Sequence, residues 1–226
     1  MEDKDFTENG FYKISNYIMW FILSNFYFII TNLPLLIVVF IFPALTPALL
    51  QIALSVALIF TAPSVAALFS IMGKLVREKD IDVTKDFFKA YKTNFGQAML
   101  IGLVQTLLIN ILYVDIIYFN SRSLPIVSYL FYFLLIYVIA LSTFLYPIMA
   151  RFYLKTKDLV ILSIVYSVKK LHFTIANIIL MVAVGFLLLN VSSFVMFFAF
   201  SAYTFVIIHW QNKVLEDIEE KIKIEK

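Results

Sequence analysis

The sequence predicts an all-α fold, a polytopic membrane helix bundle with about six transmembrane helices and both termini in the cytoplasm. The first observation is composition: the 226 residues are 62% hydrophobic and only 15% charged, with a mean hydropathy of +0.93, far outside the range of soluble domains. The second is that apolar runs long enough to cross a bilayer recur along the chain. The third is that Lys and Arg gather in the intervals that one side of such a bundle would expose.

Short breaks separate the apolar runs. The acidic segment MEDKDFTENG precedes the first run without a small-residue cleavage site after it, which predicts an uncleaved span and not a signal peptide. PALTPA and FNSRSLP predict turns, and NVSS divides a final run that is too long for one crossing. Within one integral membrane domain, 1–226, the expected spans are approximately 17–42, 48–72, 96–118, 126–150, 174–189 and 193–210, followed by a cytoplasmic C-terminal helix at 211–226.

The positive charges orient this bundle. Seventeen of the eighteen Lys and Arg residues fall in intervals on one side: Lys4 and Lys13, six from 74 to 92, five from 151 to 170, and four from 213 to 226. Only Arg122 falls on the other side. Because Lys and Arg in short loops stay on the cytoplasmic side, this asymmetry predicts that both termini lie inside, and five spans would place the C-terminal lysines on the wrong face.

The charged interval between spans two and three is amphipathic. Aromatic side chains recur there at helical spacing: Phe87, Phe88, Tyr91 and Phe95. Lysines occupy another face: Lys85, Lys89 and Lys92. We expect a helix on the inner membrane surface. It either anchors to anionic headgroups or forms a docking surface for a partner, in which case the four aromatic residues are the candidate interface.

Small residues form two stripes at the spacing that lets helices approach closely. The first is Ala62, Ala66 and Ser70 in span two, and the second is Ala98 and Gly102 in span three. Small residues repeated every fourth position allow close backbone contact between membrane helices. We therefore predict that spans two and three pack tightly along these stripes.

Polar residues within the spans are mostly uncharged. Asn25 and Asn32 are seven residues apart, on nearly one face of the first span, and are candidates for interhelical hydrogen bonds or for a polar solute pathway. Asp115 lies close to the predicted outer boundary. It is expected to be solvated or paired with Arg122, and the alternative is that it forms one side of an external ligand or partner site.

Several motifs in order carry a family resemblance. They are GFYKISNYIMWF from Gly10, Asn25, NLP at 32–34, APSVAALFSIMGKLV from Ala62, DFFKAYKTNFGQA from Asp86 and YVD at 113–115. Together they resemble the YesL-like family of bacterial integral membrane proteins of unknown function. Members of that family are often encoded beside carbohydrate uptake transporters of the ATP-binding cassette type. The resemblance thus implies an accessory role in the bacterial cytoplasmic membrane.

Residues that carry catalysis are scarce. The chain has no cysteine, and its two histidines, His172 and His209, lack an acidic or imidazole neighbour at the spacing that metal ligation from one helix needs. No phosphate-binding glycine loop, nucleophile elbow or zinc-protease motif occurs. We therefore expect neither catalytic residues nor a metal or cofactor, and a protein that is not an enzyme.

Two functions remain after these exclusions. The preferred one is a non-enzymatic accessory or scaffold component associated with a carbohydrate transport system, because such a role needs only interfaces. The alternative is a small-solute transporter or channel without proton coupling, since the spans hold no central charged residue. The expected partners are the lipid bilayer and a membrane transporter subunit, and no nucleic acid.

Overall fold

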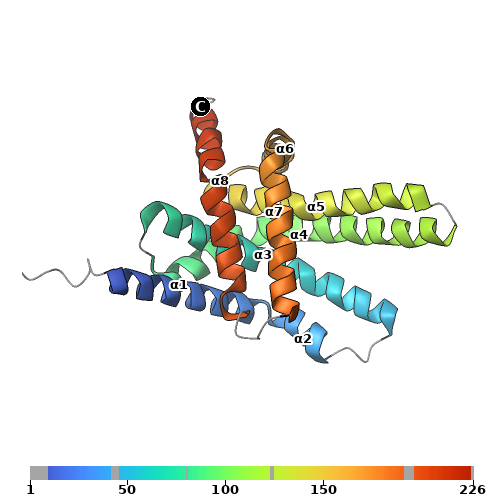
Figure 1. Cartoon of the computed structure of the whole chain (residues 1–226), viewed down its shortest axis with the longest axis horizontal. Helices are drawn as coiled ribbons and strands as arrows, with labels where there is room; N and C mark the ends of the chain where they lie inside the picture. Colours follow the sequence, from blue (N-terminus) through green and yellow to red (C-terminus); the bar gives the residue numbers. More distant parts are fainter. Residues whose placement is uncertain (1–9, 42–45, 80, 123–124, 191–195, 225–226) are drawn as a thin grey trace, which may run out of the picture.

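The computed structural model describes residues 10–41, 46–79, 81–122, 125–190 and 196–224, and α-helices account for nearly all of them (Figure 1). No strand occurs within these ranges. The helices are α1 (Gly10–Thr31), α2 (Leu33–Ile41), α3 (Pro47–Glu78), α4 (Val83–Ser121), α5 (Pro125–Arg151), α6 (Thr156–Lys169), α7 (Leu171–Asn190) and α8 (Ala199–Ile224). The predicted all-α helix bundle is confirmed.

Five of the described helices, α1, α3, α4, α5 and α7, are long and apolar enough to cross a membrane. Their outward faces carry large apolar side chains, among them Phe133 in α5 and Phe186 in α7, both 63% or more exposed. Water would disfavour so much exposed apolar surface, whereas lipid tails solvate it. The protein is therefore a multi-pass membrane protein. The sixth span stays a prediction, because α8 joins an apolar first half to a charged second half.

The first predicted span is divided into two helices. α1 ends at Thr31 and α2 begins at Leu33, so that the single span expected at 17–42 is broken at Asn32. Pro34 explains the break, because its ring would clash with the carbonyl of a continuing helix and it has no N–H to donate. In the first turn of α2, where no donor is required, the same proline is tolerated.

The predicted surface helix is not a separate element. α4 runs for 39 residues from Val83 to Ser121, so the amphipathic segment and the third span are one helix. Asp82 begins it as an N-cap, accepting a hydrogen bond from the backbone N–H of Lys85 at 3.1 Å. Gly96, at the expected boundary, does not interrupt it, because one glycine inside a helix costs only about 1 kcal/mol.

The second charged interval contains the short helix α6, which ends at Lys169 and is followed at once by α7. α7 thus begins at Leu171, slightly earlier than the fifth span expected at 174–189. α8 continues from the predicted sixth span into the C-terminal segment without a break. The last predicted turn is NVSS at 190–193: Asn190 ends α7, and 191–193 lie outside the described residues.

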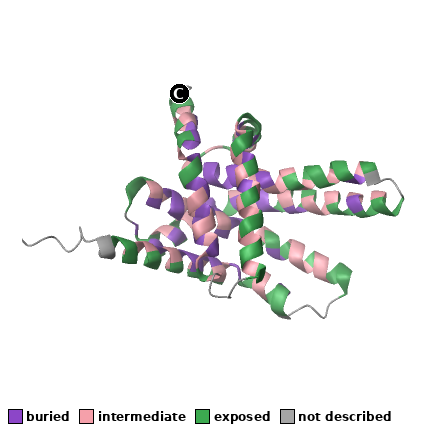
Figure 2. Cartoon of the chain, in the orientation of Figure 1, coloured by how far each residue is buried: buried purple, intermediate pink, exposed green. Residues whose placement is uncertain are grey.

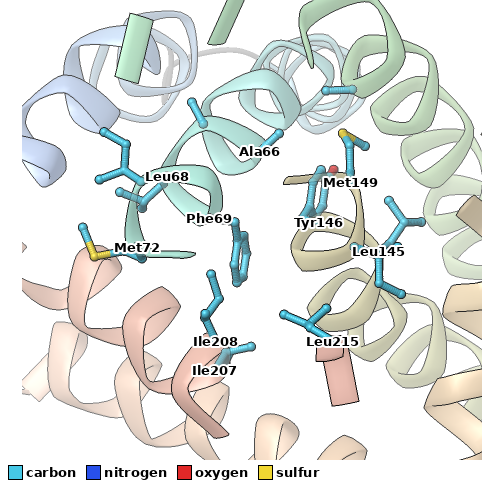
Figure 3. Packing of buried hydrophobic residues seen from close by; sticks show 14 of the residues in the cluster. Ala66, Leu68, Phe69, Met72, Leu145, Tyr146, Met149, Ile207, Ile208 and Leu215 are labelled. Carbon is cyan, nitrogen blue, oxygen red and sulfur yellow. The ribbon is translucent and has the colours of Figure 1, made fainter. Parts of the chain in front are cut away.

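α3 lies at the centre of the bundle and packs against α1, α2, α4, α5 and α8. In Figure 1 the α2–α3 and α4–α5 hairpins extend toward the right of the view, whereas α1 begins at the left and α8 ends at the top. Buried residues concentrate where these helices cross, and exposed ones cover the projecting hairpins (Figure 2). Figure 3 shows this core, in which Phe69 and Met72 of α3 lie among residues of α5 and α8.

Candidate functional site

A polar pocket of about 170 Å³ lies where α3 ends, α4 begins and α5 ends. These three regions belong to two of the intervals that the charge count assigns to the cytoplasmic side. Four cationic side chains line the pocket: Lys74, Arg77, Lys89 and Arg151. Only two acidic side chains, Glu78 and Asp86, line it with them. We call this site the basic pocket.

Lys74 is neutralised within the pocket. Its Nζ lies 2.7 Å from Oδ2 of Asp86 and 3.7 Å from Oε2 of Glu78. The same Asp86 oxygen also accepts a hydrogen bond from the backbone N–H of Asp82 at 3.2 Å. The Lys74–Asp86 ion pair therefore links the end of α3 to the first turn of α4. Lys74 thus lies within ion-pair distance of both acidic side chains that line the pocket.

Arg151 connects α5 to the C-terminal helix. Its Nη2 lies 2.7 Å from Oε2 of Glu219, its Nε donates to the same oxygen at 3.2 Å, and its Nη1 donates to Oδ1 of Asn212 at 3.1 Å. The Arg151 side chain is only 10% exposed. Hydrogen bonds from Lys223 and then Arg151 lower the pKa of Glu219 to about 2. These contacts hold the charged half of α8 against the end of α5.

Three polar side chains of the basic pocket, Arg77, Lys89 and Asn94, are not directly paired with any described residue. Within the part of the chain that the structure describes, the Arg77 guanidinium and the Lys89 ammonium make no ion pair or hydrogen bond. Asn94 is only 8% exposed, lines the pocket, and has no hydrogen-bond partner for its side-chain amide among the same residues. Among the described residues, the pocket thus holds two cations without a direct ion pair, of which Arg77 is close enough to Glu78 and Glu219 to feel their charge, and one amide without a hydrogen-bond partner.

The four predicted interface aromatics do not share one environment. Phe87 is fully buried, with its ring centroid 5.7 Å from that of Tyr27 in α1. It belongs to the core, so the docking prediction does not extend to it. Phe88 is 45% exposed and Phe95 is 38% exposed, whereas Tyr91 is half-buried and stacks on Phe87 at 6.4 Å.

The predicted small-residue stripes include a close approach of α3 to α4. A Cβ built on Gly102 would lie 2.6 Å from the Cβ of Ala62 and 3.1 Å from the backbone oxygen of Ile59. Ala66 and Ala98 are fully buried. Ser70 is partly buried, and its hydroxyl donates to the carbonyl of Ala66 at 2.9 Å.

The amides of the first span serve different structural roles. Asn25 is fully buried, donates to the carbonyl of Met196 at 2.7 Å and accepts from the backbone N–H of Ser201 at 3.3 Å, which joins α1 to the start of α8. Asn32 lies at the α1–α2 break and donates to the carbonyl of Phe28 at 2.7 Å. It lines an apolar pocket of about 280 Å³ that α3 and α8 complete.

Other in-span polar groups hydrogen-bond between helices. Gln51 of α3 donates to Oδ1 of Asn110 in α4 at 3.0 Å, and Asn110 in turn donates to the hydroxyl of Ser55 at 2.9 Å. Asn177 of α7 donates to the hydroxyl of Thr143 in α5 at 2.9 Å. Such bonds add stability to membrane helix packing, about 0.6 kcal/mol each on average.

Asp115 is half-exposed near the far end of α4. It makes no ion pair with any residue that the structure describes, and the expected pairing with Arg122 is absent. The Arg122 guanidinium instead lies over the Tyr118 ring, 5.4 Å from its centroid. Asp115 is therefore not paired with Arg122, and the alternative of an external ligand or partner site at Asp115 stays a prediction.

Sequence reasoning missed the basic pocket. The two charged intervals that form it are visible in the sequence, but they predict only the topology and, for the first interval, a surface helix. The pocket depends on the contact of Lys74 with Asp86 and on the placement of Arg151 beside the end of α3, and neither follows from local periodicity. The excess of positive charge at 74–92 and at 151–170 was the signal available.

Comparison with known proteins gives a family and a relative, both without an activity. Residues 48–116 match a family described as "Protein of unknown function, DUF624". Over 157 residues the chain is 29% identical to "Uncharacterized protein YteU" of Bacillus subtilis (strain 168), an overlap that covers 68% of this chain and 71% of that protein. No solved structure was found to match. The YesL-like resemblance stays a prediction. The matched residues 48–116 include nearly all of α3 and most of α4, and these two helices supply three of the four cations in the basic pocket.

Proposed function

We propose that this protein is a non-enzymatic accessory or scaffold component of a carbohydrate transport system in the bacterial cytoplasmic membrane. The observation that carries the proposal is the exposed surface at the start of α4. Phe88 and Phe95 are exposed there beside the exposed lysines Lys85 and Lys92. Aromatic side chains surrounded by polar residues are typical of protein interfaces, where a few such anchors supply most of the binding energy.

The hydrogen bonds that the polar groups within the spans make support the same proposal. A transporter for a polar solute needs amides and hydroxyls that line a route, whereas Asn25, Asn110 and Asn177 hydrogen-bond to neighbouring helices. An accessory protein needs no such route. The proposal that the partner is a carbohydrate transporter rests on the family resemblance alone. The relative in Bacillus subtilis supports a bacterial membrane as the location.

The test is extraction of the tagged protein from native membranes in a mild detergent, followed by identification of co-purifying proteins. We expect a transporter subunit to co-purify with the wild-type chain. The substitutions Phe88→Ala and Phe95→Ala together should release it, and Tyr91→Ala should weaken it. Truncation of one interface anchor typically costs about 2 kcal/mol or more, close to a thirtyfold loss of affinity.

Tyr129→Ala is the matched control, because Tyr129 is also an exposed aromatic residue but lies near the opposite end of the bundle, at the start of α5. It should leave co-purification unchanged. The proposal fails if native extraction yields no partner. It also fails if the partner stays bound after Phe88 and Phe95 are both truncated, while high salt alone releases it.

A further inference from the structure

We propose that the basic pocket binds a phosphate group, carried either by an anionic phospholipid headgroup or by a soluble phosphate ester. The first argument is charge. Four cations line the pocket against two acids, and those two acids are both within ion-pair distance of Lys74. Positive charge therefore exceeds negative charge among the lining side chains, and neither Arg77 nor Lys89 forms a direct ion pair with a residue that the structure describes.

The second argument is hydrogen-bonding capacity. Arginine presents planar N–H donors whose geometry matches a phosphate, and lysine adds a compact ammonium charge. Asn94 adds an amide that is 8% exposed and has no partner in the part of the chain described. Its amide N–H groups are therefore free to donate to a bound anion, and hydrogen bonds to a charged group are stronger than those between neutral groups. Three donors from two helices thus converge on one pocket.

The third argument is size and depth. A volume of about 170 Å³ is roughly tenfold the 10–15 Å³ that one water molecule needs in a cavity, enough for a small anionic group. Ile71, Met149 and Phe152 give the pocket an apolar side. The pocket lies at the ends of α3 and α5, at the predicted cytoplasmic boundary, where the headgroups of anionic lipids lie and where basic pockets between membrane helices bind them.

The experiment uses the purified full chain in nanodiscs and in detergent. Phosphatidylglycerol and phosphatidylcholine are the lipid probes, and glycerol 3-phosphate and inorganic phosphate are the soluble probes. Binding is followed by native mass spectrometry and by the shift in thermal stability. We expect phosphatidylglycerol to bind about tenfold or more tightly than phosphatidylcholine, since hydrogen bonds to charged groups contribute about 1.5 kcal/mol or more.

The double substitution Arg77→Gln with Lys89→Gln should reduce phosphatidylglycerol binding about tenfold or more without changing the stability of the ligand-free protein, because neither side chain makes an ion pair with a described residue. The charge-matched control is Lys155→Gln with Lys157→Gln, two exposed lysines at the start of α6 that do not line the pocket. It should change binding by no more than about twofold, as expected for surface charges. Arg77→Lys should restore part of the affinity, since it keeps the charge but loses the planar donors.

The outcomes separate the two sources. Selective binding of phosphatidylglycerol that glycerol 3-phosphate does not displace identifies a lipid headgroup, whereas binding of the soluble probes with the same variant dependence identifies a soluble phosphate ester. The proposal is wrong if neither class binds selectively, or if the control pair loses as much affinity as the pocket pair. It is also wrong if only an acidic peptide binds in a manner that depends on Arg77 and Lys89.

Discussion

Gly102 of α4 faces Ala62 of α3 so closely that an added Cβ would lie 2.6 Å from the Ala62 Cβ. Cβ atoms in folded proteins do not approach to this distance, and the next nearest atom is the backbone oxygen of Ile59 at 3.1 Å. Neither atom belongs to a flexible side chain that could move aside. Any side chain at 102 must therefore push the two helices apart.

We predict that Gly102→Ala lowers the stability of the protein by about 1–3 kcal/mol, the usual cost of overpacking a tight contact. The measurement is thermal unfolding in detergent. Gly96→Ala is the matched control in the same helix, because an added Cβ there has nothing within 4 Å. It should be neutral or stabilising by up to about 1 kcal/mol, owing to the higher helix propensity of alanine. Equal effects at the two positions would contradict the close contact.

Phe87 and Phe88 are adjacent in sequence, yet they should respond differently to truncation. Phe87→Ala removes a fully buried ring that contacts Tyr27, so we expect a loss of about 3–5 kcal/mol. Phe88→Ala removes a ring that is 45% exposed, so we expect roughly 1 kcal/mol. Thermal unfolding and the yield of folded protein measure both. A larger loss for Phe88 would mean that the register of α4 on α1 is wrong.

Acid should weaken the attachment of the C-terminal half of α8. The pKa of Glu219 falls from 4.5 to about 2 through its hydrogen bonds with Lys223 and Arg151, and that of Asp217 is lowered by hydrogen bonds from Lys221 and Tyr166. A carboxylate whose pKa is lower in the folded state stabilises the fold above its unfolded pKa. This stabilisation is lost as the pH falls through the folded value. The sensitive window is therefore about pH 4.5 to 2.

The test compares the melting temperatures of the wild-type chain and of Glu219→Gln at pH 6 and at pH 3. The advantage of the wild-type chain should shrink at the lower pH, because protonation removes the same charge that the substitution removes. Glu220→Gln is the control, since Glu220 is exposed and makes no ion pair with a described residue. A wild-type advantage that stays constant with pH would show that Glu219 acts by packing and not by charge.

Topology can be tested by single cysteines because the chain has none of its own. We predict that Ser121→Cys, at the end of α4, reacts with a membrane-impermeant maleimide only from the outside. Lys92→Cys, near the start of the same helix, should react only from the cytoplasm. Both residues are exposed. Labelling of Ser121→Cys only from the cytoplasmic side would reverse the orientation derived from the positive charges.

The sequence alone determined that this is an all-α membrane protein and where most of its helices lie. Hydropathy and helical periodicity are local properties, and the bilayer permits only helices or closed barrels, so long apolar runs leave little choice of structure. Prolines also act locally, although the interruption at Asn32 next to Pro34 was not anticipated. The grouping of Lys and Arg was visible for the same reason, because it requires only counting along the chain.

Only the tertiary structure decided which residues of those helices meet. Gly96 did not show whether the surface helix and the third span are separate. One glycine inside a helix costs only about 1 kcal/mol, which packing contacts along the helix easily offset. Phe87 is buried whereas Phe88 is 45% exposed, although the rings of both contact Tyr27, which lies far away in the sequence. Arg151 contacts Glu219 across 68 residues of chain. The basic pocket exists only because the end of α3, the start of α4 and the end of α5 lie together. Such contacts depend on packing between distant segments, whose free energy is not encoded in any single stretch of residues.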